Sequence, residues 1–584
     1  MSKAIINWIS GPVLRAKTQD TFHINEAVRV GDKNLLGEVI RIQEQEIVAQ
    51  VYEDTSGLRP GVVVEGSGLP LAVRLGPGLL GNIVDGLLRP LSATGSNFIE
   101  PGAYQAEAHV FPFRPEVKPG ASVRGGQVFG GVHPKEGKAQ RCLVPPGLQG
   151  EIVDIVPAGD YTEDHCLCTL RAPDGSQHEI AMSHLWPVRR PRPISERLPI
   201  EGPMLTGQRI LDGLFPVARG GKAALPGGFG TGKTVLQEAL AKWCDADIIV
   251  YVGCGERGNE MAGVLHEFPQ LEDPRNGRPL MERTVIIANV SNMPVAAREA
   301  SIYTAVTVAE YFRDQGLHVA LMADSTSRWA EALREVSGRL GELPAEAGYP
   351  AYLSSRLANF YERAARVRTL GGEEGSVTLI GAISPPGGDF SEPVTTHSKR
   401  YVRCFWALDR IRAHARFYPA IHPLQSYSED VAALAPWWQK KGNPQWASTR
   451  RRFLTLLEQQ AHLERMARIV GKDALPARQQ LILLCAQLIN EGFLRQSANS
   501  PVDRYASPER QTIMMRLLIR FIELAEKAVD DDVEVERMAV LPVVRRLQRM
   551  GEDVPEDRLD LFDGISELLE SDFAALKGAP VHAG

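Results

Sequence analysis

Hydrophobic and polar positions alternate in different ways along the chain, and each pattern predicts a different kind of domain. Residues 1–70 contain short runs rich in β-branched side chains, such as 47–52, which glycines separate. This pattern predicts strands joined by tight turns, and hence a small N-terminal β-barrel. Residues 71–110 indicate a structured connector. Residues 111–195 are rich in glycine and proline and indicate a separate β-rich insertion with its own small core.

Residues 196–430 alternate strand-like with helix-like segments, which predicts an α/β domain with a mostly parallel sheet. The segments 247–252, 284–289 and 318–323 are almost entirely apolar, as strands covered on both faces are. Each ends at or near polar residues. Because ligands of open α/β sheets bind at the carboxyl ends of the strands, these ends are candidate site positions.

Residues 431–584 show almost no strand pattern. Apolar residues recur there with the period of an amphipathic helix. The helical segments are 450–470, 479–493, 508–529 and 534–550, the last interrupted by Pro542. We therefore expect a C-terminal helical bundle and a multidomain fold for the chain as a whole.

A glycine-rich stretch in the α/β domain matches the phosphate-binding pattern of glycine, four residues, and Gly-Lys-Ser/Thr. Its residues are Gly227, Gly228, Phe229, Gly230, Thr231, Gly232, Lys233 and Thr234. The glycines let backbone N–H groups approach a triphosphate, Lys233 would place a cation on the phosphates, and Thr234 would offer a hydroxyl to Mg²⁺. A helix-like segment begins at Val235, and its N-terminus would add positive charge. The alternative is a glycine-rich turn that binds nothing.

A second glycine-rich turn follows the strand at 247–252 and carries Glu256, Arg257 and Glu260. Phosphoanhydride hydrolysis needs a group that holds and polarises the attacking water. We assign this role to Glu256; the alternative is a solvated loop glutamate. Arg257 would hold a phosphate oxygen or pair with a carboxylate. Glu260 would orient Arg257 or cap the next helix.

The strand at 318–323 ends at Asp324. An acidic residue at the end of an apolar strand is the usual partner of a phosphate loop and binds Mg²⁺ directly or through water. The alternative is an N-cap for the following helix, because aspartate is a favoured cap. The presence of Lys233 and Thr234 favours the metal role.

Composition limits the remaining possibilities. The chain has 584 residues, 44% of them hydrophobic and 23% charged, with a net charge of -6, which predicts a soluble protein without a general affinity for nucleic acid. No apolar run reaches the roughly 18 residues that span a bilayer, and no signal peptide precedes the barrel. We expect a cytoplasmic protein that meets membranes only through partners. His165, Cys166 and Cys168 resemble part of a metal site, but alternation along a strand explains them better.

Long motifs of the chain resemble those of one family. The stretches 227–234, 252–261, 323–335 and 381–395 look like the catalytic A subunit of the vacuolar and archaeal-type rotary ATPases. The resemblance covers essentially the whole chain, and the insertion at 111–195 is similar to the family's bulge domain. It implies an N-terminal β-barrel, a nucleotide domain and a helical bundle. It also implies ATP hydrolysis or synthesis coupled by rotation to proton or sodium transport.

The resemblance also assigns partners and residues. Three copies would alternate with three B subunits around a central stalk, with peripheral stalks and a separate membrane sector that moves the ion. Lys233 and Thr234 take the phosphate and Mg²⁺ roles, Glu256 activates water, and Arg257 supports a phosphate. Phe229 and Phe417 match aromatic positions near the adenine of ATP or ADP, and Gln496 begins a stretch that matches a loop beside the base. A neighbouring B subunit would supply an arginine finger.

Three other functions remain to be weighed against this one. A non-catalytic subunit of the same assembly is disfavoured by the presence of Lys233, Thr234 and Glu256. A secretion or flagellar export ATPase would be shorter and lack the insertion. A hexameric nucleic-acid motor would need a basic or aromatic surface, which the net charge of -6 does not favour.

Overall fold

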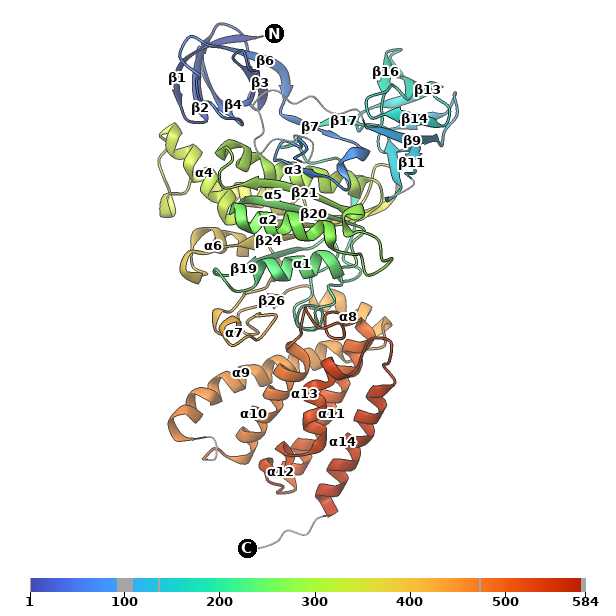
Figure 1. The fold of residues 1–584 in the computed structure, drawn as a ribbon, viewed down its shortest axis with the longest axis vertical. Coiled ribbons are helices and arrows are strands. Elements are labelled where there is room, and N and C mark those ends of the chain that lie inside the picture. Colours follow the sequence, from blue (N-terminus) through green and yellow to red (C-terminus); the bar gives the residue numbers. More distant parts are fainter. Residues whose placement is uncertain (1, 92–108, 135–136, 472–473, 579–584) are drawn as a thin grey trace. The chain divides into compact units, whose positions relative to one another are not determined.

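A computed structural model describes residues 2–91, 109–134, 137–471 and 474–578; residues 92–108 of the predicted connector lie outside this part. The chain forms two compact units (Figure 1). The first unit comprises residues 1–199, 219–224 and 246–402. The second comprises residues 200–218, 225–245 and 403–584.

The first unit begins with a closed six-stranded barrel, as predicted. Its strands are β1 (Lys3–Ser10), β2 (Val13–Thr18), β3 (Glu26–Val30), β4 (Leu35–Gln43), β5 (Glu46–Val51) and β6 (Val63–Pro70), in the order β1-β2-β5-β4-β3-β6. Inward-facing side chains such as Ile6, Leu14 and Val28 form its core. Closure leaves the barrel without a free sheet edge, which explains how such short strands form a stable module.

Two four-stranded antiparallel sheets follow within the region expected to be an insertion. Their strands are β9 (Val110–Pro115), β10 (Ser122–Arg124), β11 (Val128–Val132), β12 (Gln140–Leu143), β13 (Gln149–Ile155), β14 (Gly159–Thr162), β15 (Cys168–Arg171) and β16 (Gln177–Ile180). Phe113, Phe129 and Leu170 are fully buried between them. Cys168 is buried in β15 and belongs to the same core, but His165 and Cys166 precede this strand, so the predicted alternation of all three along a strand is wrong.

The α/β part of the first unit is built on a mostly parallel sheet. Its strands run in the order β19 (Lys222–Pro226), β24 (Glu374–Ile383), β22 (His318–Asp324), β20 (Ile248–Glu256), β21 (Thr284–Val290) and β8 (Ile83–Val84). The short strand β23 (Ala365–Arg368) pairs with β24 and with β18 (Glu196–Arg197), whereas β7 (Ala72–Leu75) and β17 (His184–Pro187) form a separate two-stranded sheet. Every residue of β20 is buried, which fits a strand covered on both faces.

Five helices accompany this sheet. They are α2 (Gly258–Glu267), α3 (Val295–Asp314), α4 (Thr326–Leu340), α5 (Leu353–Tyr361) and α6 (Pro393–Lys399). Helix α3 is buried along almost its whole length and carries charged residues into the interior. Glu299 forms ion pairs of 2.7 Å with Arg189, and Asp314 one of 2.6 Å with Arg192. These pairs neutralise carboxylates that would otherwise be costly to bury.

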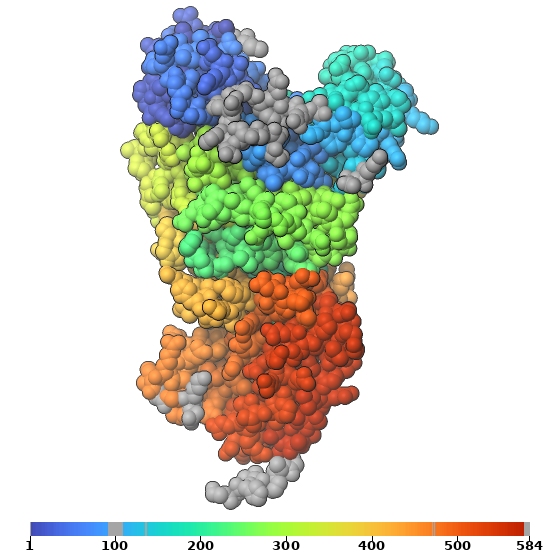
Figure 2. Space-filling model, in the orientation of Figure 1, coloured from blue at the N-terminus to red at the C-terminus, as the bar shows by residue number. Residues whose placement is uncertain are grey.

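The second unit contains α1 (Lys233–Trp243), the hairpin of β25 (Cys404–Phe405) and β26 (Tyr427–Ser428), and α7 (Arg410–His414). Its helical bundle, seen in orange and red in Figure 2, consists of α8 (Val431–Lys440), α9 (Trp446–Val470), α10 (Ala477–Ile489), α11 (Pro508–Asp530), α12 (Val535–Ala539), α13 (Pro542–Asp553) and α14 (Leu561–Gly578). Two π-helical turns, η2 (Ile210–Leu214) and η7 (Asn490–Leu494), also belong here. Pro542 starts α13 instead of interrupting a helix, since proline fits the first turn.

Candidate active site

The predicted phosphate loop of the second unit joins β19 to α1. Gly230 and Gly232 have positive φ angles of 76° and 81°, a conformation that favours glycine. The Thr231 hydroxyl donates to the Gly228 carbonyl over 2.8 Å and holds the loop turned. Helix α1 begins at Lys233, so the N–H groups of its first turn and its partial positive charge lie at the loop. Such a structure suits a phosphate chain.

An aromatic ring lies against this loop. A β-carbon on Gly232 would lie 3.3 Å from Cε1 of Tyr418, whose ring is 43% exposed. The ring of Phe417, the residue named from the sequence, instead packs against the Arg412 guanidinium, with 4.6 Å between its centroid and Cζ. Sequence reasoning missed Tyr418, although its position next to Phe417 and before Pro419 was visible.

A group of carboxylates lies at the carboxyl ends of β20 and β22 in the first unit. Glu256 ends β20 and is 8% exposed, and Asp324 ends β22 and is 2% exposed. The two parallel strands pair in register, with Gly253 opposite Asp324. The Tyr251 hydroxyl donates to Asp324 over 3.4 Å. The alternative role of Asp324 as an N-cap is wrong, because Ser325 occupies the cap position of α4.

Glu260 belongs to the same group. A hydrogen bond with Glu256 and partial burial raise the pKa of the Glu260 carboxyl to about 7, and the charge of Asp324 acts in the same direction. Glu260 lies in the first turn of α2, whose N-cap is Arg257. The side chain of Glu260 also faces the carboxylate of Glu256, a contact that the sequence did not predict.

Family models match the chain over all its domains. The nucleotide-binding domain of the ATP synthase alpha/beta family matches residues 207–428, and the family's beta-barrel domain matches residues 6–68. The alpha/beta subunit barrel-sandwich domain matches residues 105–189. The C-terminal domain of V and A type ATP synthase matches residues 435–539.

Relatives extend this match to the full length. The V-type ATP synthase alpha chain of Halothermothrix orenii is 51% identical, over 97% of this chain and 98% of its own. The A subunit of the A-type ATP synthase of Thermococcus onnurineus is 52% identical, over 93% and 94%. The V-type ATP synthase alpha chain of Nitrosococcus oceani is 47% identical, over 99% of both. The chain belongs to the A-subunit family of A-type and V-type ATP synthases.

A solved structure has the same fold as this A-subunit family member. The ATPase EscN of the type III secretion system of enteropathogenic E. coli superposes with a TM-score of 0.64, over 88% of this chain and all of its own. The two sequences are 22% identical. At that identity the likeness shows the shared fold alone.

Arginines surround the Glu256 turn of the A-subunit chain. A β-carbon on Gly255, where φ is 73°, would lie 2.6 Å from Cδ of Arg298 and 3.0 Å from Cβ of Arg328. Burial opposes ionisation of Arg328, but Glu331, Glu256 and Glu260 raise the pKa of its guanidinium overall. Arg257 is exposed and lowers the pKa of Glu260 in part. The carboxylates of this group are thus balanced by nearby positive charge.

The hydrogen bonds of Gln496 differ from those expected of a residue that contacts the base directly. Its side-chain amide accepts from Arg209 N–H over 2.7 Å and donates to the Gly207 carbonyl over 2.8 Å. Its backbone N–H donates to the Tyr418 carbonyl over 2.9 Å. The oxygen and the nitrogen of the side-chain amide are therefore both used within the protein.

In the part of the A-subunit chain that the structure describes, no helix combines the length and the apolar character needed to cross a bilayer. Among the same residues, histidine, cysteine and acidic side chains form no cluster of three or more with the arrangement of a metal site.

Proposed function

We propose that this chain is the catalytic subunit of a V/A-type rotary ATPase, which hydrolyses or synthesises ATP at an interface with a B subunit. Rotation would couple the reaction to proton or sodium transport. The observation that carries the proposal is the buried carboxylate of Glu256 at the end of β20 in a chain that also has an intact glycine loop ahead of Lys233. A non-catalytic homologue would have no use for both.

Each phosphate-site residue has a distinct part in this proposal. Gly227, Gly228, Gly230, Thr231 and Gly232 shape the loop, and the first turn of α1 around Val235 supplies N–H groups to the phosphates. Lys233 neutralises charge on the β- and γ-phosphates. Glu256 holds the attacking water and accepts its proton as the water attacks the γ-phosphate. Arg257 is exposed at the start of α2 and holds a phosphate oxygen.

Mg²⁺ fits the donor groups of this chain. Magnesium prefers oxygen ligands, usually one or two from the protein with water and phosphate completing the octahedron. Thr234 offers a hydroxyl in the first turn of α1, and Asp324 a carboxylate at the end of β22. Bound with ATP or ADP, the ion would neutralise charge on the phosphates.

The base side of the nucleotide is proposed to involve aromatic rings. Tyr418 lies at the phosphate loop, and Phe229 is 82% exposed within it. Either ring offers a flat face on which a base can stack. Phe417 supports this region through its packing on Arg412, and Gln496 supports it through the Tyr418 carbonyl.

The assembly proposed is a ring of three A subunits alternating with three B subunits, with central-stalk and peripheral-stalk partners. The B subunit would supply an arginine finger that stabilises the transition state. The chain would then lie in the cytoplasm, at the membrane only through the ion-translocating sector, and bind no nucleic acid.

The ATPase activity of the purified chain, alone and mixed with its cognate B subunit, tests the proposal. We expect little turnover alone and strong activation on mixing, because the site lacks its arginine until the partner binds. Full activity of the lone chain would contradict the proposal and would favour a homohexameric motor that supplies its own arginine.

A further inference from the structure

A buried ion pair in the second unit joins two segments that are far apart in sequence. Arg209, which is 1% exposed, bonds to Asp503, which is 4% exposed. The Arg209 guanidinium also donates to the Phe493 carbonyl over 2.8 Å and to the Arg495 carbonyl. The guanidinium therefore bonds to the end of η7 and, through Arg495 and Asp503, to the chain between η7 and α11. This stretch, residues 495–507, has no helix or strand of its own.

The same stretch is bonded to the aromatic residue at the phosphate loop. Asp503 accepts from Ser497 N–H over 2.9 Å, which fixes the turn that Gln496 begins. The Gln496 side chain binds back to Arg209 N–H and to the Gly207 carbonyl, and its own N–H donates to the Tyr418 carbonyl. Arg209, Tyr418, Gln496 and Asp503 line one cavity of about 400 Å³. A continuous series of bonds thus runs from the ion pair to Tyr418.

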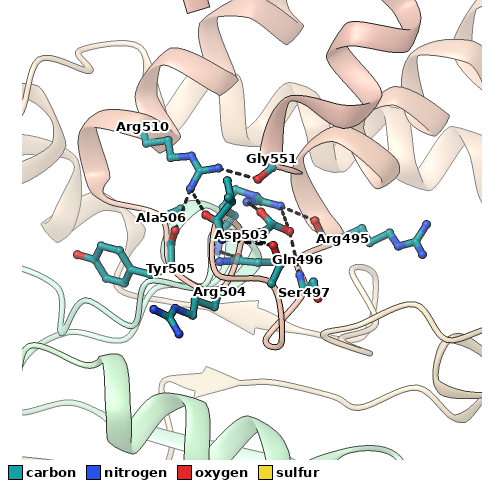
Figure 3. Close-up of polar contacts among 12 residues, drawn as sticks. Arg495, Gln496, Ser497, Asp503, Arg504, Tyr505, Ala506, Arg510 and Gly551 are labelled. Atoms are coloured by element: carbon teal, nitrogen blue, oxygen red, sulfur yellow. Dashed lines mark hydrogen bonds and ion pairs between the residues drawn. The ribbon is translucent and has the colours of Figure 1, made fainter. Parts of the chain in front are cut away.

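The helical bundle closes this arrangement from its other side. Figure 3 shows Arg510 bonded to the loop and to Gly551 of α13. Its guanidinium donates to Val502 over 2.9 Å, to Tyr505 over 3.0 Å and to Gly551 over 2.7 Å. A β-carbon on Gly551 would lie 2.8 Å from Oδ1 of Asp503, so only glycine lets α13 approach the ion pair so closely.

We propose that Arg209 and Asp503 are positioning residues for nucleotide binding, which act through Gln496 to hold Tyr418 against the phosphate loop. The inference rests on the proposed function. According to this proposal, a buried ion pair contributes to the affinity for the base side of the nucleotide without contacting the nucleotide directly.

The physical reason for this role lies in the bonds that hold residues 495–507 in shape. Residues 495–507 have no regular ladder of backbone bonds, so their shape depends on these side chains. Loss of one partner of a buried ion pair leaves an uncompensated charge, which the loop relieves by moving. Movement of Gln496 releases the Tyr418 carbonyl and with it the ring. Phosphate contacts, made by the loop at 227–234, stay in place.

The test compares ATP with tripolyphosphate, which lacks base and ribose, in titrations of the full chain with Mg²⁺. Asp503→Asn is expected to weaken ATP binding about tenfold and to leave tripolyphosphate binding unchanged, the loss of about one charge-assisted hydrogen bond. In a Tyr418→Ala background, Asp503→Asn should cause no further loss of ATP affinity. The same tenfold loss in both backgrounds would overturn the proposal, as would equal losses for ATP and tripolyphosphate.

Matched controls separate positioning from stability. Asp314→Asn breaks a similarly buried pair with Arg192 in the first unit, so it should lower thermal stability without changing either affinity. Gly551→Ala keeps both charges and adds one methyl group against them, and it should weaken ATP binding even if Asp503→Asn fails to fold. Its counterpart, Gly564→Ala in α14, has open space around the new methyl group and should leave affinity unchanged.

Lys233→Ala distinguishes a failure of the proposed ATP site from a failure of the positioning role. If Lys233→Ala leaves ATP affinity unchanged, the ATP site itself is wrong, and the positioning role is wrong with it. If Lys233→Ala weakens ATP binding but Gly551→Ala and Asp503→Asn do not, only the positioning role is overturned.

Discussion

The Tyr418 ring lies 3.3 Å from the position that a β-carbon on Gly232 would occupy. Gly232 is also the N-cap of α1 and has a φ angle of 81°. One glycine therefore meets two demands: a left-handed backbone and close approach of an aromatic ring. Both demands arise where the phosphate loop ends and helix α1 begins.

Gly232→Ala should weaken ATP binding by about tenfold. A left-handed alanine costs roughly 1–2 kcal/mol, and the added methyl group presses on Tyr418, so the loop leaves its phosphate-binding shape. Equilibrium titration with ATP measures the effect. Gly263→Ala in α2 has no atom within 4 Å of the new methyl group and should leave binding as in the wild type. Unchanged ATP affinity in Gly232→Ala would contradict the assigned loop geometry.

Glu256→Gln should lower turnover of the assembled enzyme by about 100-fold or more while ATP affinity stays nearly the same. The amide keeps the shape of the side chain but cannot accept the proton of the attacking water. Steady-state ATPase assays and ATP titration give the two quantities. Glu267→Gln, an exposed change at the end of α2, is the control. Wild-type turnover in Glu256→Gln would show that another group activates the water.

Asp212 should make stability depend on pH in a defined window. Burial raises the pKa of its carboxyl to about 6 from an ordinary value of 3.8, against hydrogen bonds from Thr206, Gln511 and Gly207. The folded state then binds a proton that the unfolded state has lost, so stability falls by up to about 3 kcal/mol as pH rises from about 4 to 6. The thermal midpoints of the wild type and of Asp212→Asn should be measured across this window, and the difference between them should change with pH. A difference that stays constant with pH would refute the raised pKa.

Arg189→Met should destabilise the first unit by roughly 3–5 kcal/mol. Arg189 pairs with Glu38 at 2.8 Å and with Glu299 at 2.7 Å, and both carboxylates are buried. Methionine of similar length would leave two buried charges without their partner. Thermal or denaturant unfolding measures the loss. The neighbouring exposed Arg190, changed in the same way, should cost far less; equal losses would assign the effect to general packing.

The domain types and the sheet could be predicted because local patterns determine them. Strands β20, β21 and β22 are apolar on both faces, and each begins within one residue of its predicted start. Helix α14 was missed, although Phe562, Ile565 and Leu569 are buried along it. The stretch that precedes α14 is acidic and contains Pro555, a composition typical of a break between helices. No helix was therefore predicted beyond this stretch.

The site was only partly predictable, for a different reason. Gly-Lys-Thr and Glu256 lie in contiguous motifs, which a local pattern identifies. Arg209 and Asp503 are 294 residues apart, and only the folded backbone brings them together. Phe417 and Tyr418 are adjacent aromatics, so composition cannot decide which ring meets the loop. The left-handed Arg416 before them, with a φ of 56°, belongs to the turn that decides it.

The buried charges of α3 bear on whether the insertion is separable. Arg189 and Arg192 lie inside the segment 111–195, yet they are the counter-ions of Glu299 and Asp314 in the middle of the sheet-bearing part. Excision of that segment would remove one ion-pair partner from each of these carboxylates along with the surface module, and Asp314 would keep only Arg313. The insertion is therefore not an optional appendage, because its last residues are part of the electrostatic core.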